Sequence, residues 1–75
     1  MSGDPAAVVR EAVAFNPRTP ADILERLSQD GEPSVRRGVG GNRTTPGEIL
    51  ERLAEDPDSA VRSMVRANPG SSQRR

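Results

Sequence analysis

Three arginines that recur at a constant interval are the clearest candidates for binding chemistry in this sequence. Arg10, Arg36 and Arg62 are each 26 residues apart. A guanidinium is a planar fork of N–H donors that matches a carboxylate or a phosphate in a bidentate fashion. If this interval places the side chains at equivalent positions of a folded repeat, they form an arginine ladder for an acidic protein or a nucleic acid. The alternative is structural, with each arginine bridging to an aspartate of a neighbouring repeat, here Asp30 or Asp56.

A second candidate site is the middle of the chain, where glycine and arginine replace the residues found 26 positions earlier. The replacing residues are Arg37, Gly38, Gly40, Gly41 and Arg43. Glycine costs a helix roughly 1 kcal/mol relative to alanine, so three glycines require an explanation. They could let the backbone of a partner approach beside the arginines, allow close packing within a middle layer, or reflect sequence drift. The candidate partner-binding residues are therefore Arg10, Arg36, Arg37, Arg43, Arg62, Gly40 and Gly41.

The composition offers little for catalysis. The chain contains no His and no Cys, so the common nucleophilic triads and the thiolate ligands of metals have no residues to form them. Its aspartates fall where helices are expected to begin, which already explains them in structural terms. We therefore predict that the protein is not an enzyme and that it has no cofactor or metal.

The charge balance bears on the kind of partner. The chain has 11 basic residues, all of them arginine, and 11 acidic residues, with one Phe and no Trp or Tyr. Nucleic-acid-binding modules are usually basic and often stack bases on aromatic side chains. Another protein is the expected partner, and a nucleic acid is the alternative.

The sequence also predicts the cellular location of the protein. No apolar run approaches the roughly 20 residues that span a bilayer. The first residues lack the basic and apolar regions of a secretory signal peptide. We expect a cytoplasmic protein that does not bind a membrane.

The elements that must position these residues repeat at the same interval. Identical pentapeptides, Ile-Leu-Glu-Arg-Leu, occupy residues 23–27 and 49–53. Valines spaced by four residues share one face of a helix, and three such pairs recur. The pairs are Val9 and Val13, Val35 and Val39, and Val61 and Val65. Self-similarity at a fixed period is the signature of a repeat architecture.

Each repeat is predicted to contain two short helices. An aspartate should cap the first helix, and Asp4 and Asp56 each precede a proline, which suits a first helical position. An asparagine, which tolerates the left-handed conformation, should end it. The second helix should begin at a Thr-Pro pair whose hydroxyl caps it. The expected helices cover residues 5–15, 20–29, 33–41, 46–55 and 58–67.

We predict an all-α fold, a short α-solenoid of about two and a half two-helix repeats. A two-helix unit this short cannot bury its apolar face alone, whereas stacked copies can. One domain covers residues 1–75, with repeat units at approximately 4–29, 30–55 and 56–72 and loose ends at 1–3 and 70–75.

The last helix suggests a further alternative, self-association. Met64 stands where the earlier repeats have alanine or glycine, which would enlarge the apolar surface beside Val61 and Val65. A homodimer through this C-terminal helix would bury that surface.

The combined motif resembles the leucine-rich repeat variant family of bacterial proteins. It runs Asp-Pro-x-x-x-Val-Arg-x-x-Val and then Asn-Pro-x-Thr-Pro-x-x-Ile-Leu-x-x-Leu-x-x-Asp. The resemblance implies a solenoid related to HEAT and armadillo repeats, in which one helix of each unit is partly a 3₁₀-helix. With the composition, it leads us to predict a non-enzymatic protein–protein interaction module.

Overall fold

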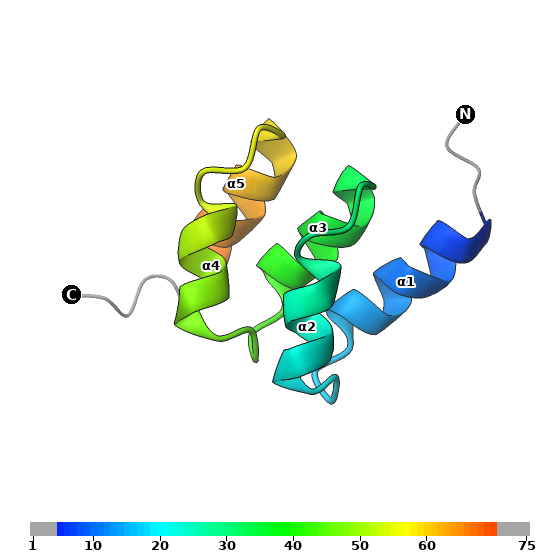
Figure 1. Ribbon diagram of the computed structural model, residues 1–75. Helices are drawn as coiled ribbons and strands as arrows, with labels where there is room; N and C mark the ends of the chain where they lie inside the picture. The colour runs from blue at the N-terminus through cyan, green and yellow to red at the C-terminus, as the bar shows by residue number, and fades with distance from the viewer. Residues whose placement is uncertain (1–4, 71–75) are drawn as a thin grey trace.

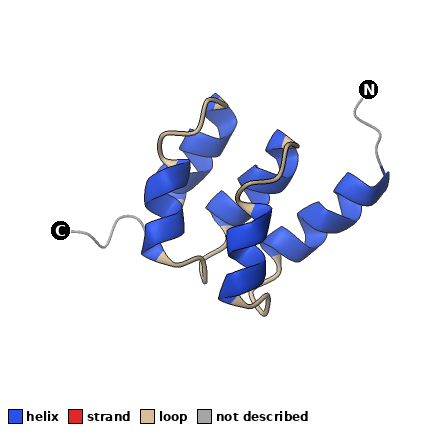
Figure 2. Cartoon of the chain, in the orientation of Figure 1, coloured by secondary structure: helices blue, strands red, loops and turns tan. Residues whose placement is uncertain are grey.

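The computed structural model describes residues 5–70, and all regular secondary structure in this range is helical. It forms five helices and no strand (Figure 2). The helices are α1 (Pro5–Phe15), α2 (Ala21–Leu27), α3 (Pro33–Gly41), α4 (Gly47–Leu53) and α5 (Ser59–Ala67). The predicted all-α fold is confirmed, although α2 and α4 are shorter than expected. Apart from Gly70, the expected loose ends lie outside the described residues.

The helices are arranged in two layers (Figure 1). Helices α1, α3 and α5 lie side by side, with α3 packed against both of the others. Helix α2 packs against α1 and α3, and α4 packs against α3 and α5. The first helix of each unit thus contributes to one layer and the second helix to the other, which is the stacking expected of a solenoid. No described residue forms a 3₁₀-helix, so the second helices are short α-helices instead.

The core lies between the two layers and contains the repeated apolar residues. Leu24, Val35 and Val39 are 0% exposed and Leu50 is 2% exposed. The valine pair of α1 differs, because Val9 is 63% exposed and Val13 is 37% exposed. Helix α3 is covered by the preceding α2 and α5 by the preceding α4, whereas no described helix precedes α1. Equivalent side chains therefore have different burial at the N-terminal end of the stack.

The threonines before the second helices do not cap them, contrary to the sequence-based prediction. Neither α2 nor α4 has a side-chain hydrogen bond at its N-cap. Thr45 Oγ1 instead donates to the carbonyl of Val39 over 2.8 Å, and Thr19 donates in the same way to Val13. Each of these carbonyls also accepts a backbone amide, from Asn16 or Asn42. The hydroxyls thus add a second bond at the ends of the first helices, and they fasten the two helices of one unit together.

The aspartates expected as caps lie two residues too early. The N-cap residues of α3 and α5 are Glu32 and Asp58, while Asp4 lies outside the described residues. Asp30 Oδ1 accepts a hydrogen bond from the Glu32 amide at 2.9 Å, and Asp56 accepts one from Asp58 at the same distance. Each aspartate therefore closes a turn before the helix, and its Oδ2 atom accepts a hydrogen bond from an arginine of the preceding repeat.

The asparagines at the ends of the first helices are not left-handed. Asn42 has φ −80° and ψ 121°, and Asn68 has φ −75° and ψ 125°. The prediction was wrong because the chain leaves each helix in an extended conformation. This conformation turns the asparagine side chain toward the preceding repeat, as described below.

The glycines of α3 permit close packing against both neighbouring helices. A Cβ added to Gly38 would lie 2.9 Å from Ala14 Cβ and 3.3 Å from the Glu11 carbonyl oxygen. A Cβ on Gly40 would lie 3.2 Å from Cγ2 of Val65. These contacts favour the packing interpretation of the glycines, because α1 and α5 occupy the space that a larger residue at Gly38 or Gly40 would need.

We expect Gly38→Ala to lower the free energy of unfolding by about 1–2 kcal/mol, because overpacking outweighs the gain of roughly 1 kcal/mol in helix propensity. Gly47→Ala is the matched control, since a Cβ there meets nothing within 4 Å. The control should raise the free energy of unfolding by about 0.5–1 kcal/mol. Urea unfolding followed by circular dichroism measures both. A stabilising Gly38→Ala would show that α1 and α3 tolerate wider spacing.

Candidate functional site

Two members of the arginine ladder bind aspartates of the next repeat. Arg10 Nε donates to Asp30 Oδ2 at 2.6 Å, and its Nη2 donates to Oδ1 at 3.2 Å. Arg36 repeats the arrangement with Asp56, at 2.8 and 3.2 Å. Both pairs are bidentate, the geometry in which an arginine–carboxylate bond is strongest. The contacts therefore favour the structural interpretation of Arg10 and Arg36.

The second pair is more deeply buried than the first. The side chains of Arg36 and Asp56 are 15% and 6% exposed, against 35% and 13% for Arg10 and Asp30. The hydrogen bond from Arg10 holds the pKa of Asp30 below its ordinary value. Burial alone would raise the pKa of Asp56, but the bonds from Arg36 and the Asp58 amide lower it on balance. Both aspartates are thus charged members of an inter-repeat network at neutral pH.

Buried asparagines form a second inter-repeat network that the sequence analysis missed. Asn42 Nδ2 donates to the carbonyls of Ala14 and Asn16 at 2.7 and 2.9 Å. Asn68 Nδ2 repeats this one unit later, donating to Gly40 and Asn42 at 2.8 and 2.9 Å. Each asparagine satisfies carbonyls at the end of the preceding first helix. The invariant recurrence of asparagine was the signal, because a simple helix end would also accept glycine.

An open groove lies between α1 and α3 on the outer surface of their layer. It is lined by Val8, Glu11, Ala12, Phe15, Ser34, Arg37 and Gly38. Val8 is 59% exposed and Phe15 is 56% exposed. Large exposed apolar side chains that gather on one surface of a soluble domain often mark a contact site. We call this surface the α1–α3 groove.

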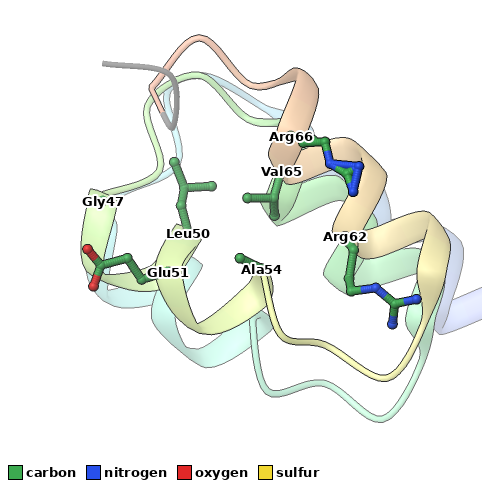
Figure 3. A pocket seen from close by; sticks show the side chains of 7 residues that line it. All are labelled: Gly47, Leu50, Glu51, Ala54, Arg62, Val65 and Arg66. Carbon is green, nitrogen blue, oxygen red and sulfur yellow. The ribbon is translucent and has the colours of Figure 1, made fainter. Parts of the chain in front are cut away.

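A deeper groove of about 370 Å³ lies between α4 and α5, the last two described helices. Figure 3 shows its lining residues, which are Gly47, Leu50, Glu51, Ala54, Arg62, Val65 and Arg66. The side chains of Leu50 and Val65 point toward each other across it, while both arginines lie along the α5 side (Figure 3). We call this surface the C-terminal groove. It combines an apolar floor with a rim that carries two arginines and one glutamate, Glu51.

Comparison with known families agrees with this geometry. The sequence pattern of the leucine rich repeat variant family matches residues 7–32 and residues 33–58. The chain belongs to this family. No curated protein and no solved structure matches it. In this leucine rich repeat variant chain, each of the two junctions between successive first helices has one arginine–aspartate bridge and one asparagine that donates two hydrogen bonds.

The structure distributes the other predicted partner-binding residues of this leucine rich repeat variant chain over different surfaces. Arg37 lines the α1–α3 groove, Arg43 is exposed in the turn after α3, and Arg62 lines the C-terminal groove. Gly40 is buried, and its carbonyl accepts the Asn68 bond. A Cβ on Gly41 would meet the end of the Met64 side chain. The middle glycines and arginines therefore do not form one open site.

The residues predicted for self-association occupy the inner side of α5. Val61 is 0% exposed and Val65 is 4% exposed, so the repeat's own core already covers them. Met64 is partly buried and approaches Gly40 and Gly41 of α3. Val61 is therefore covered by the core, Val65 is reachable only where it lines the C-terminal groove, and the homodimer stays a prediction.

Within residues 5–70, no group of three or more His, Cys, Asp or Glu residues could hold a metal ion. None of the helices in that range is both long and apolar enough to cross a membrane.

Proposed function

We propose that this repeat domain is a protein–protein interaction module and that its α1–α3 groove receives the partner. The observation that carries this proposal is the apolar stripe on α1. Val8, Ala12 and Phe15 are spaced by four and three residues, so they share one helix face, and all three are exposed. Interaction sites commonly combine such a stripe with a charged rim, here supplied by Glu11 and Arg37.

The closed interior of the repeat supports a binding role. Among the described residues, no buried side-chain nitrogen or oxygen lacks a hydrogen-bond partner. Catalytic centres commonly keep titratable groups with perturbed pKa values in a cleft. The carboxyl groups with lowered pKa, Asp30 and Asp56, are committed to arginines at repeat junctions instead. The proposed activity is therefore non-enzymatic.

A nucleic acid is the alternative partner that the arginine ladder suggested. Arg10 and Arg36 already bind carboxylates, so two of the three positions are occupied. Arg37 and Arg43 are the better test residues. A nucleic-acid module would bind single or double strands at low salt, lose affinity steeply as salt rises, and lose it on Arg37→Glu. The bacterial cytoplasm remains the predicted location.

We expect Phe15→Ser/Arg37→Glu to lose the partner of the parental protein, because it removes the aromatic residue and reverses the charge at the α1–α3 groove. Affinity capture from the native host with quantitative mass spectrometry tests this, followed by titration of the purified partner. Arg26→Ala, an exposed change on α2, is the matched control and should retain the partner. Circular dichroism should show all three proteins equally folded. If every captured protein binds the double variant as well as the control, the proposed surface is wrong.

A further inference from the structure

The bonds of Arg36 indicate what the equivalent arginine of the next repeat, Arg62, can bind. Arg36 is held by two sets of bonds, because its Nη1 donates to the Asp30 carbonyl at 2.7 Å while Nε and Nη2 grip Asp56. Arg62 has the same anchor, since its Nη1 donates to the Asp56 carbonyl at 2.7 Å. The carbonyl bond holds one nitrogen of the guanidinium and leaves Nε and Nη2, the atoms with which Arg36 binds Asp56, for another acceptor.

These two atoms of Arg62 have no carboxylate among the described residues. The ion pairs in residues 5–70 join Arg10, Arg36 and Arg52 to acidic residues, and Arg62 is exposed. Within residues 5–70, Nε and Nη2 of Arg62 therefore have no carboxylate, whereas the same atoms of Arg10 and Arg36 each bind one.

The C-terminal groove beside Arg62 corresponds to a space that is filled one repeat earlier. Ala54 is exposed in the groove, whereas the equivalent residue of the earlier repeat, Ser28, is 6% exposed. Ile49 of α4, a helix that packs on α3, is 3% exposed and borders a small gap whose other side is formed by α2. In the earlier repeat the neighbour is therefore α4, a short helix with an apolar face that is followed closely by Asp56, the residue that binds Arg36. A partner that fills the C-terminal groove needs the same two features.

Arg66 distinguishes this groove from a site for a further identical repeat. The equivalent residues of the first two units, Ala14 and Gly40, are small and buried where first helices meet. An arginine at that position prevents another first helix from packing at the same close distance. It adds a second positive charge to the rim, which favours an acidic occupant over a second copy of this chain, whose net charge is zero.

We propose that the C-terminal groove binds a short amphipathic helix of a partner protein that carries a carboxylate. The apolar face of the helix packs mainly on exposed Ala54 and on the edges of Leu50 and Val65, which are 2% and 4% exposed. The carboxylate of the helix bonds to Nε and Nη2 of Arg62. Such helix-in-groove recognition draws affinity from apolar anchors and specificity from the charge pair. This is a second surface, separate from the α1–α3 groove.

A blocked synthetic peptide with the sequence of residues 46–58 is the probe, because it contains the apolar face of α4 and Asp56. Isothermal titration should show that it binds the parental protein, and Arg62→Ala should weaken binding about tenfold or more. The Asp56→Asn peptide should bind the parental protein with the same loss and show little further loss on Arg62→Ala. Arg52→Ala is the control, since this α4 arginine is 49% exposed and lies outside the groove.

Three results would overturn the proposal. The peptide fails to bind at millimolar concentration, or it binds Arg62→Ala as tightly as the parental protein. Equal binding would mean that the peptide displaces α4 and the following Asp56, which pairs with Arg36. A dimer of the protein alone that Arg62→Ala abolishes would instead identify a second copy as the occupant. Phe15→Ser/Arg37→Glu should bind the peptide normally, so failure at the α1–α3 groove is distinguishable.

Discussion

Asn42→Ala should lower the free energy of unfolding by about 2–4 kcal/mol. The substitution removes the two bonds to the preceding repeat and leaves the Ala14 carbonyl without the Asn42 donor, while the Asn16 carbonyl keeps its bond from the Thr19 amide. It also removes the acceptor of the Thr44 amide and hydroxyl. A buried polar group that loses its partner costs about 1–3 kcal/mol, and Asn42 is 2% exposed. A domain of this size has only about 4–11 kcal/mol in total, so the loss is a large fraction.

Asn16→Ala is the matched control for this prediction. Asn16 occupies the same repeat position, but it is exposed, and its described side-chain bond is to the nearby Arg18 amide. We expect a change within about 0.5 kcal/mol, as for most surface substitutions. Urea unfolding followed by circular dichroism compares the two variants. Equal losses would show that asparagine acts within its own helix end and not between repeats.

Arg36→Ala should lower the free energy of unfolding by about 2–4 kcal/mol. Removal of one partner from a buried ion pair typically costs about 3–5 kcal/mol, because the other charge is left unpaired, and the 15% exposure of Arg36 moderates this. The substitution also removes the donor to the Asp30 carbonyl. Arg52→Ala provides the control, because Arg52 and Glu25 are both 49% exposed and such pairs contribute about 0–1 kcal/mol.

The pH dependence separates the ion pair from packing by the arginine stem. Bonding to Arg36 contributes to the lowered pKa of Asp56, whose ordinary value is 3.8. Its contribution is therefore fully present above that ordinary value and is lost as the pH falls through the lower pKa of the folded state. The difference in free energy of unfolding between the parental protein and Arg36→Ala should shrink over this acidic range. A difference independent of pH would assign the effect to packing alone.

The sequence alone determined the repeat and its helices. The identical pentapeptides, the valine pairs and the prolines are local signals, and they placed α1 and α3 at the observed bounds. The spacing also placed Arg36 and Asp56 at positions that a stacked repeat can join, although the bridge remained one of two interpretations. These features follow from periodicity, because a residue that returns after a constant interval must occupy an equivalent place in each unit.

The tertiary structure decided how the polar residues are used. Sequence rules assigned Thr45 and Asn42 to helix ends, where isolated helices need caps, but their side chains bond to Val39 and to the preceding repeat. A carbonyl of the preceding unit becomes a competing acceptor only after the units stack. The sequence could not reveal that competition, because it depends on distances between helices.

The tertiary structure also decided which equivalent residues are accessible. Val39 is buried while its counterpart in α1 is partly exposed, and Arg36 is paired while Arg62 faces an open groove. Periodicity makes such residues equivalent, but burial depends on the neighbouring described helices, and α3 packs against a first helix on each side while α1 and α5 each pack against one. The C-terminal groove therefore arises beside α5, where Arg62 matches Arg36 in sequence but differs in its described neighbours.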